Sequence, residues 1–525
     1  MILNLKNFNE FIDYKHFKME TIEDVINTIQ KNDFMASVDL KDAFFSIPIF
    51  QNHQKYLKFS FENNFYKFLC MPNGYGPAMR IFTKTLKVPF AHLRKLGHVS
   101  VVYVDDNLLF GRSVSECNNN IHNTIYILRH LGFTIHVEKS ILTPTQKIIF
   151  LGFVINSIDM TMELTEEKKL KILDLCKSVT TGKAISIRKL ASIIGNLVSS
   201  FPAVPYGKLF YRNLELDKIN ALKFHRGNFD SCCVISSKSM DEIRWWINNV
   251  ESSIRYIETP TIDMTIFTDA SSEGWGISHN KVKNGGRWDA FESTLHINCL
   301  ELLAIYFGIK TFCKNKNNIH VRIMSDNTTA IAYVNNMGGI KSHMCNEITK
   351  RIWMWCIQNN IWVSAAHIPG IDNIDADTAS REFNDAIEWM LNPIHFRHIT
   401  NVFGMPNVDL FASRVNKQIN KYVSWKPEPE AFAVDAFTIN WNNCYPYIFP
   451  PFRILGKVIA KIMEESVHAI VIVPDWPTQS WYPLVKRIAK DVIAIPMQCN
   501  TLQLMHKQTE VHPLYPKLKL LAIQT

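Results

Sequence analysis

The sequence lacks the features that mark membrane-bound and secreted proteins. No apolar run approaches the roughly 18 residues of a membrane-spanning helix, and no charged N-terminal segment precedes a long apolar one, so we expect no signal peptide. The eleven cysteines include no Cys-x-x-Cys pair and no other metal-ligand spacing. We therefore expect reduced, packed thiols in an intracellular protein of the cytoplasm or nucleus, with no disulfide framework and no membrane partner.

The chain does have the length and composition of a large globular protein. Its 525 residues are enough for about three or four domains of ~100–200 residues each. Hydrophobic residues make up 47% of the chain and charged residues 20%, so a large core can form. The net charge of +9 suits a polyanionic partner without requiring one.

Two adjacent carboxylates, Asp105 and Asp106, stand between the apolar runs Val99–Val102 and Leu108–Phe110. Runs of this kind around a polar turn predict a hairpin with its acids at the turn. Adjacent carboxylates repel each other, and a divalent ion such as Mg²⁺, which takes oxygen ligands, relieves that repulsion. The alternative is that Asp-Asp-Asn is only favourable turn chemistry.

Four further motifs surround this hairpin. Ala36–Leu40 is a short predicted strand that carries Asp39, and Phe68–Ala78 is a loop rich in Pro and Gly that lets backbone approach a ligand. Because Asp39 lies 66 residues before Asp105, any shared site must be assembled by the fold. The remaining two motifs are Gly132–Ser140 and Phe150–Phe153.

In this order and spacing the five motifs resemble the reverse transcriptases of retroviruses and retrotransposons. The resemblance implies a right-hand polymerase palm with partial fingers in residues 1–160, where Asp39, Asp105 and Asp106 hold two Mg²⁺ or Mn²⁺ ions. It implies an RNA template, a DNA primer and deoxynucleoside triphosphates as substrates. The family's triphosphate-clamping basic residues lie upstream of the segment that resembles Leu3–Lys6, so we expect either a piece of a longer polyprotein, with truncated fingers, or an impaired triphosphate grip.

The same resemblance assigns nucleotide contacts. Phe44 matches an aromatic gate that rejects a 2′-hydroxyl, and Lys139 matches a lysine that protonates pyrophosphate. Asn73, where many retroviral relatives have Gln, and Gly74 are expected to contact the nucleotide. The alternatives are that Phe44 is a core aromatic and that Lys139 is a solvated loop lysine.

Residues 161–215 are predicted to form a thumb and residues 216–260 a connection. Thr165 and Ser186 each begin a predicted helix, and Trp245 and Trp246 lie in an amphipathic stretch. The second helix keeps an apolar face at Ile187, Leu190, Ala191, Ile194, Leu197 and Val198. A basic set is expected either to track a phosphate backbone or to form a solvated face: Lys168, Lys169, Lys171, Lys183, Arg188 and Lys189.

Four acids mark residues 261–392. Asp269 lies in a predicted strand, Asp326 ends another, and Asp377 lies at the start of a helix. Glu301 is the lone acid in the apolar helix Ile297–Ile309. Because burying an unpartnered carboxylate is costly, Glu301 predicts a metal or a basic partner.

These four acids, in this order, resemble the site of ribonuclease H. The resemblance implies an RNase H-like α/β domain in which two metals, held by the four acids, activate water against the RNA of an RNA–DNA hybrid. His367, on a predicted loop, matches the family's mobile histidine; the alternative is a satisfied loop histidine. A hybrid of any sequence must be bound through its shape and backbone.

Residues 400–515 carry Asp409 near a strand end and the run Phe449–Phe452, and their strand–helix–strand pattern predicts an α/β unit. Behind the two preceding domains, this segment resembles the polyproteins of DIRS-type retrotransposons, which integrate with a tyrosine recombinase, and phage-type adenine-N6 DNA methyltransferases with a Rossmann-like fold. Those enzymes have an acid or amide where Phe449 stands, and a phenyl ring cannot polarise an amine. We therefore expect a degenerate domain without methyl transfer, in which Asp409 is either a cofactor residue or a structural remnant.

Together these patterns predict a multidomain protein of α+β and α/β class, with RNA-directed DNA polymerase and ribonuclease H activity. The rival hypothesis is a truncated, non-polymerising nucleic-acid-binding remnant or scaffold, with or without RNase H activity. A third is a host-adopted RNase H whose polymerase half only binds hybrids.

Overall fold

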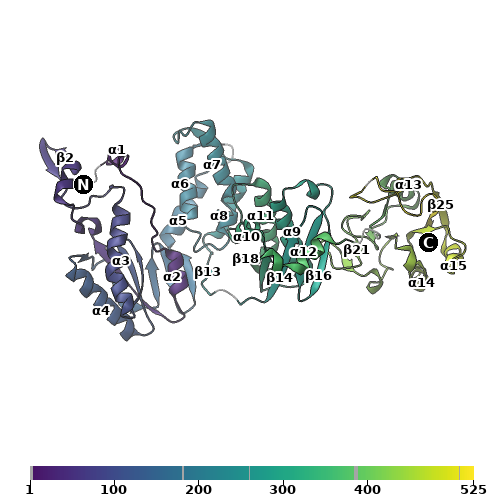
Figure 1. Ribbon diagram of the computed structural model, residues 1–525, viewed down its shortest axis with the longest axis horizontal. Coiled ribbons are helices and arrows are strands. Elements are labelled where there is room, and N and C mark those ends of the chain that lie inside the picture. Colours follow the sequence, from purple (N-terminus) through teal and green to yellow (C-terminus); the bar gives the residue numbers. More distant parts are fainter. Residues whose placement is uncertain (1–3, 180–182, 259–260, 384–387, 508) are drawn as a thin grey trace. The chain divides into compact units, whose positions relative to one another are not determined.

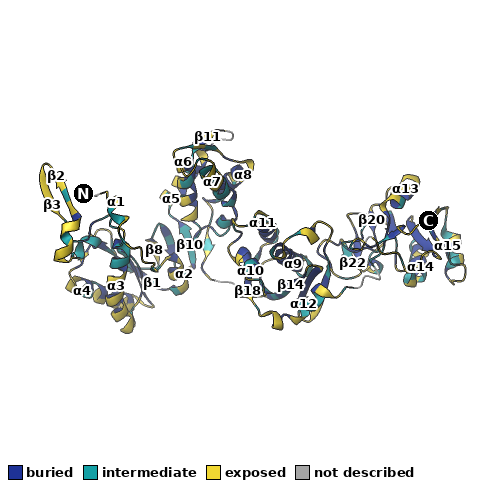
Figure 2. Cartoon of the chain, turned by 45° about the horizontal axis from the view of Figure 1, so that its top comes forward, coloured by how far each residue is buried: buried dark blue, intermediate teal, exposed yellow. Residues whose placement is uncertain are grey.

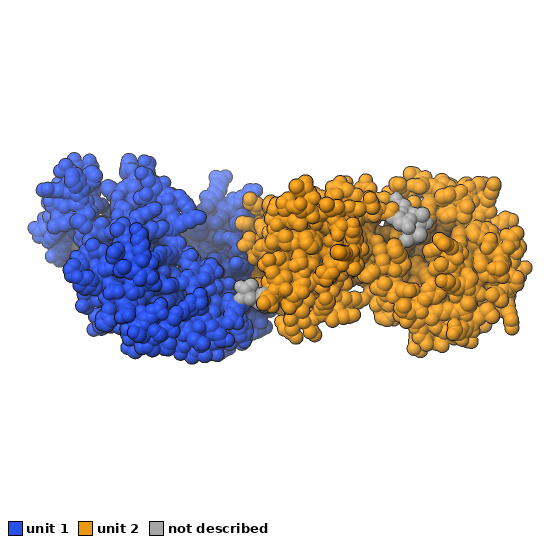
Figure 3. Space-filling view, turned by 60° about the horizontal axis from the view of Figure 1, so that its bottom comes forward, with its two compact units in different colours: residues 1–259 blue, residues 260–525 orange. Residues whose placement is uncertain are grey.

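The computed structural model describes residues 4–179, 183–258, 261–383, 388–507 and 509–525. The chain divides into two compact units, residues 1–259 and 260–525 (Figure 3). The predicted domain limits at residues 1 and 260 fall outside the described residues. Among the described helices, none combines the length and apolarity that a membrane crossing requires.

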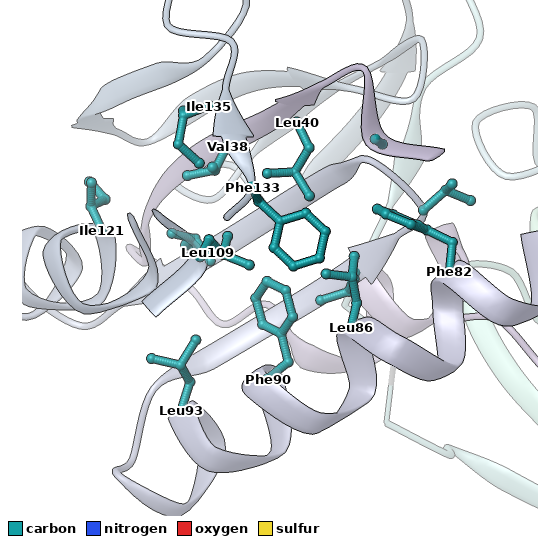
Figure 4. Packing of buried hydrophobic residues seen from close by; sticks show 14 of the residues in the cluster. Val38, Leu40, Phe82, Leu86, Phe90, Leu93, Leu109, Ile121, Phe133 and Ile135 are labelled. Carbon is teal, nitrogen blue, oxygen red and sulfur yellow. The ribbon is translucent and has the colours of Figure 1, made fainter. Parts of the chain in front are cut away.

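The first unit contains an antiparallel sheet in the order β4-β5-β1-β6, with β7 also paired to β1 (Figure 1). Helix α3 packs on it through Phe82, Leu86, Phe90 and Leu93, which recur every three or four residues and point toward strand residues such as Leu109 (Figure 4). This core fixes the strands that carry the predicted acids. The elements are α1 (Lys6–Asn9), α2 (Ile22–Thr28), β1 (Phe34–Lys41), α3 (Ala78–Lys95), β4 (Val99–Tyr103), β5 (Asp106–Gly111), α4 (Val114–His130), β6 (Thr134–Ile135) and β7 (Ile141–Thr145).

The first unit contains further, smaller sheets. The hairpin of β2 (Lys58–Phe61) and β3 (Asn64–Lys67) is exposed along most of its length (Figure 2). A second sheet has the order β13-β10-β9-β8. Its strands are β8 (Lys147–Phe150), β9 (Phe153–Asn156), β10 (Thr161–Leu164) and β13 (Arg255–Tyr256).

Helices α5 to α8 form one bundle, because α5 packs on α6 and α8, and α7 packs on α6 and α8. Helix α7 therefore runs across the predicted limit between thumb and connection at residues 215 and 216, and this limit does not separate two bodies in the structure. Thr165 and Ser186 cap α5 and α6, as predicted. The elements are α5 (Glu166–Lys177), β11 (Ala184–Ser186), α6 (Ile187–Val198), α7 (Arg212–Phe224), β12 (Cys232–Val234) and α8 (Ser237–Asn249).

The apolar face of α6 is rotated slightly from the predicted one. Ile187, Leu190, Ile194 and Leu197 are buried, but Val198 is exposed. The prediction for Val198 is wrong because, at 100° per residue, it lies at the edge of a face that is centred nearer Leu190 and Leu197. Buried Ile193 lies on the other edge instead.

The second unit begins with a five-stranded sheet in the order β16-β15-β14-β17-β18. The first three strands are antiparallel neighbours, whereas β14, β17 and β18 run parallel. Central β14 carries Asp269. The elements are β14 (Met264–Ala270), β15 (Gly274–His279), β16 (Val282–Arg287), α9 (Ile297–Phe312), β17 (Ile319–Ser325), α10 (Thr328–Asn335), α11 (His343–Gln358), β18 (Ile361–His367) and α12 (Ile374–Arg381).

Helices α9 and α12 cover opposite faces of this sheet. Ile277 of β15 lies against Gly308 of α9, whereas its neighbour Gly276 lies against α12, and successive strand residues point to opposite faces. A Cβ atom at Gly276 would lie 1.9 Å from the carbonyl oxygen of Ala376, and one at Gly285 would lie 2.2 Å from that of Ala379. Two glycines therefore allow the helix with Asp377 to approach the sheet.

Replacing Gly276 with Ala should destabilise the second unit by at least about 2 kcal/mol, because the added methyl overlaps helix backbone that cannot move without displacing α12. Urea unfolding of the full chain measures the change. Gly456→Ala is the matched control, because a Cβ there would meet only Trp481 at an ordinary 3.8 Å. Equal unfolding midpoints for the two variants would contradict the close-approach argument.

The end of the chain forms an α/β sheet in the order β20-β23-β24-β27-β25. β20, β23 and β24 are parallel, and β27 is antiparallel between β24 and β25. Helix α14 packs against Val471 and Val473 on one face, and α13 packs against Ile470 and Ile472 on the other. The elements are β19 (Met390–Leu391), α13 (Pro393–Phe403), β20 (Val408–Asp409), β21 (Val423–Ser424), β22 (Ala433–Val434), β23 (Pro446–Ile448), α14 (Leu455–Glu465), β24 (Ile470–Pro474), α15 (Tyr482–Ile488), β25 (Asp491–Ile495), β26 (Leu502–Gln503) and β27 (Leu520–Gln524).

Candidate functional sites

The three palm acids meet where β1 and β5 pair. Asp39 lies directly opposite Asp106 in the antiparallel register. The amide of Leu40 donates a 3.1 Å hydrogen bond to the carbonyl of Asp105. The fold thus joins acids that are 66 residues apart in the sequence, as the spacing required.

The turn between β4 and β5 is strained. Val104 has φ of 54°, a left-handed conformation that a β-branched residue rarely adopts. Its side chain is buried, so packing holds the turn in place. Such strain persists only where the surroundings over-determine the backbone, and it concentrates at functional sites.

The charges of this site repel one another. Burial, followed by the charges of Asp105 and Asp39, raises the pKa of Asp106 to about 6. Burial also raises the pKa of Asp39, while nearby Lys139 lowers it. A bound divalent cation would offset both the burial of these carboxylates and the repulsion between them, so Asp39, Asp105 and Asp106 fit a metal site.

Two uncharged residues that the sequence did not single out support the acids. The Asn107 side-chain amide donates to the carbonyls of Val38 (2.9 Å) and Asp105 (3.1 Å), and Asn107 is fully buried. The Ser140 hydroxyl accepts from the amide of Asp39 at 3.0 Å. No sequence signal marked Asn107, because it stands in the polar Asp-Asp-Asn stretch, where an amide is ordinary turn chemistry.

The predicted nucleotide contacts lie in different surroundings. Phe44 is partly buried and makes an edge-to-face contact with Phe82, 5.4 Å between ring centres, so it is packed against the palm core. Lys139 is exposed but close enough to Asp39 and Asp106 to lower their pKa values. Neither observation tests the predicted gate or proton donor.

The loop with Asn73 and Gly74 is held by Asn9, another residue that the sequence analysis missed. The Asn9 side chain donates to the carbonyl of Gly74 at 2.9 Å and accepts from the amide of Gly76 at 2.8 Å. Gly74 has φ of 88°, which only glycine adopts readily. The loop is therefore shaped by contacts on both sides of Tyr75.

Four of the six predicted phosphate-binding residues contact other groups of the protein: Lys168, Lys169, Arg188 and Lys189. Lys168 lies over the Phe153 ring and donates to the carbonyl of Ser199, and buried Lys169 pairs with Glu166 at 2.8 Å. Arg188 pairs with Asp230, and Lys189 donates to the carbonyl of Ser178. Lys171 and Lys183 are exposed. The six residues therefore do not form one continuous phosphate-binding row.

A second carboxylate cluster lies in the second unit. Ligand oxygens of Asp269, Glu301 and Asp326 lie within 4.8 Å of one another. Within the described part of the chain, Oε2 of Glu301 is buried without a hydrogen-bond partner. Burial, followed by the charges of Asp269 and Asp326, raises the pKa of Glu301 to about 9. An orphaned carboxylate oxygen between two other acids fits a divalent cation.

The fourth acid, Asp377, stays outside this cluster of three. It pairs with Arg381 at 2.8 Å on the same helix. The hydroxyl of buried Ser380 donates to Oδ2 of Asp269 at 2.7 Å. Sequence reasoning missed Ser380 and Arg381, although their spacing of three and four residues from Asp377 places all three on neighbouring turns.

His367 is the last residue of β18 and not part of a loop, so that detail of the prediction is wrong. It pairs with Ser325, the residue before Asp326, because β17 and β18 run parallel to the same edge. Its side chain is exposed beside the strand end that carries the acid.

The C-terminal sheet carries a cavity of about 640 Å³. It opens beyond the carboxyl ends of β20 and β23, the usual ligand position in α/β sheets. Its lining includes the aromatic residues Trp389, Phe411, Trp425, Phe437, Phe449 and Phe452.

Asp409 does not line this cavity. It is buried, its Oδ2 accepts from the amide of Gln418 at 3.0 Å, and burial raises its pKa to about 7. These contacts match the structural alternative for Asp409.

Comparison with curated proteins gives remote relatives. The enzymatic polyprotein of Cauliflower mosaic virus (strain CM-1841) is 23% identical over 402 residues, covering 73% of this chain and 55% of that protein. The enzymatic polyprotein of Figwort mosaic virus (strain DxS) is 22% identical over 414 residues, covering 73% and 56%. The chain thus spans about half the length of the curated relatives it matches.

Among solved structures, the foamy viral protease-reverse transcriptase in complex with dsDNA is similar at a TM-score of 0.43 and 15% identity, over 70% of this chain and 75% of that one. The same protein in complex with an RNA/DNA hybrid gives 0.42 and 15%, over 74% and 52%. The family model described as reverse transcriptase (RNA-dependent DNA polymerase) matches residues 1–155. The segment that matches this family model contains all three palm acids, Asp39, Asp105 and Asp106.

Proposed function

We propose that this chain is the RNA-directed DNA polymerase and ribonuclease H of a DIRS-type retrotransposon, followed by a degenerate methyltransferase-like domain. The observation that carries the proposal is the pair of separate carboxylate clusters, one across β1 and β5 and one around buried Glu301. The substrates are an RNA template, a DNA primer, deoxynucleoside triphosphates and the resulting RNA–DNA hybrid. The eleven cysteines are free thiols, which suits action inside the cell.

In the polymerase site, Asp39, Asp105 and Asp106 would hold Mg²⁺, or Mn²⁺ in its place. Two such ions activate the primer hydroxyl and stabilise the leaving pyrophosphate. Asn107 and Ser140 keep the acid-bearing backbone in register. Phe44 and the loop of Asn73 and Gly74 bind and orient the nucleotide, and Lys139, near Asp39, supplies a proton to pyrophosphate.

In the second site, Asp269, Glu301 and Asp326 would hold the ions, with Asp377 as the fourth ligand. The ions supply an activated water for attack on the RNA phosphodiester. Ser380 keeps Oδ2 of Asp269 oriented. His367, exposed at the neighbouring strand end, helps water enter or product leave the site.

Two assays on the full chain test the proposal: primer extension on an RNA template and release of fragments from a labelled RNA–DNA hybrid, both with Mg²⁺. Both activities together support it. Hybrid cleavage without extension supports the rival of a non-polymerising RNase H. Salt-sensitive hybrid binding without either activity supports the scaffold.

The C-terminal domain should transfer no methyl group to DNA. Phe449 lines the cavity and stands at the position where the methyltransferases that this segment resembles have an acid or amide, and its phenyl ring cannot accept a hydrogen bond from the target amine. Incubation with labelled S-adenosylmethionine and DNA should leave the DNA unlabelled. Labelling that is lost on Pro450→Ala would refute this expectation.

A further inference from the structure

We propose that Arg381 is a substrate-operated latch: it holds Asp377 away from the other three acids until an RNA phosphate takes its guanidinium, and Asp377 then completes the site. This inference rests on the proposed ribonuclease H function. It adds a phosphate-binding residue and an order of assembly to that function.

The first observation is the division of the four acids. Asp269, Glu301 and Asp326 form one compact cluster, but Asp377 is paired with Arg381 through Oδ1 and Nε at 2.8 Å. Arg381 also interacts electrostatically with Asp269 and Asp326. A cation therefore lies beside an acidic site, and the fourth acid is paired with it.

The second observation is that the helix itself is fixed. The Asn373 side chain donates to the carbonyl of Thr268 at 3.0 Å, and the hydroxyl of Ser271 donates to the carbonyl of Ser380 at 2.7 Å. One bond joins the start of α12 to Thr268 of β14, and the other joins the end of α12 to Ser271, which follows β14. The two bonds therefore lie on either side of Asp269. Any rearrangement of Asp377 is therefore a side-chain rotation and not a movement of α12.

The third observation is that the ion pair can open at low cost. The Arg381 side chain is 62% exposed and the Asp377 side chain 44%. Exposed pairs of this kind contribute little to stability. Within the described residues the hydrogen bond of the Arg381 side chain is the one from Nε–H to Asp377, which leaves the terminal nitrogens available to a phosphate.

An RNA phosphate that enters the acidic cluster needs a cation to offset repulsion by the carboxylates. A guanidinium offers a planar fork that binds two phosphate oxygens at once. When it turns to the phosphate, Asp377 loses its partner and is free to join the other acids. Substrate binding and completion of the site are thus coupled.

The first test is hybrid affinity. Arg381→Gln should weaken binding of an RNA–DNA hybrid about tenfold in Ca²⁺ and lower the slope of log affinity against log salt by about 1. Lys283→Gln is the matched control. Lys283 of β16 pairs at 2.6 Å with Asp375, which lies on α12 like Asp377, and its side chain is also exposed. Equal effects of the two variants would show a general charge effect and overturn the assignment.

The second test measures Mn²⁺ binding to the hybrid-free chain by electron paramagnetic resonance. The palm acids are replaced in every variant, so that the signal reports the second site. Arg381→Gln should tighten binding at the second site about two- to fivefold, because Asp377 is released. That gain should vanish in Arg381→Gln/Asp377→Asn. A gain that persists in the double variant would be a plain charge effect, and no gain at all would exclude the latch.

The opposite signs of these two effects distinguish a latch from lost folding, which would weaken both hybrid and metal binding. Hybrid cleavage that survives the substitution Asp269→Asn would instead refute the proposed ribonuclease H function. Cleavage that requires Asp269 but is unchanged in rate and KM by Arg381→Gln would refute the latch alone.

Discussion

Replacing Asp106 with Asn should lower primer extension on an RNA template by at least about 10³-fold, which corresponds to ~4 kcal/mol in the activation free energy. Asp106 faces Asp39 across the strand pair, and its pKa is raised to about 6 by burial and then by the negative charges of Asp105 and Asp39. An amide of the same size keeps the strand pairing but removes the charge that a divalent cation requires.

Hybrid cleavage by the same variant should stay within about twofold of wild type, because the carboxylates proposed for cleavage, around Glu301, lie in the second unit. Asp174→Asn, at an exposed position on α5, is the control for loss of one negative charge. Primer extension that survives Asp106→Asn would show that Asp106 is not needed for polymerisation and that other residues carry the chemistry. Loss of both activities would indicate misfolding, which circular dichroism detects.

The parts of the first site that sequence alone predicted are local ones. The hairpin around Asp105 follows from two apolar runs and a polar turn, and the strand with Asp39 follows from its alternation. The pairing of Asp39 with Asp106 needed the resemblance, because no local pattern fixes which strands become neighbours. The strain at Val104 could not be predicted, since valine normally avoids that conformation.

The second site shows the same limit at longer range. Glu301 was recognisable because a lone acid interrupts an apolar helix, and within the described residues its Oε2 is buried without a hydrogen-bond partner, so the expected metal or basic partner stays a prediction. The contacts of Ser380 and Gly276 could not be predicted, because both depend on how closely α12 approaches the sheet. In the C-terminal domain, Asp409 ends strand β20 as predicted, yet its buried carboxylate accepts from the amide of Gln418 and does not line the cavity.

Replacing Glu301 with Gln should abolish hybrid cleavage, with a loss of at least about 10³-fold, while the metal-free fold is retained. The reason lies in the raised pKa of Glu301, about 9, which means that the metal-free side chain is neutral at pH 7. Gln is a neutral side chain of the same size, so the melting temperature in EDTA should change little. Glu464→Gln, at an exposed position on α14, controls for the substitution elsewhere in the unit.

The same pKa predicts how pH acts on the second unit. A carboxyl whose folded pKa is raised stabilises the metal-free fold most below its unfolded value, near 4.5, and this contribution is lost as pH rises toward 9. Metal binding requires the ionised form, so apparent Mg²⁺ affinity should rise with pH, by up to about tenfold per unit for one released proton.

Thermal melts between pH 6 and 9 separate these opposite trends. In EDTA the wild-type second unit should lose stability with pH, and Mg²⁺ should add more stability at pH 8.5 than at pH 6.5. Glu301→Gln should flatten the first trend and remove most of the second. If Mg²⁺ stabilised wild type and Glu301→Gln equally at every pH, the orphaned oxygen of Glu301 would not be a metal ligand, and the second catalytic site would have to be built from other acids.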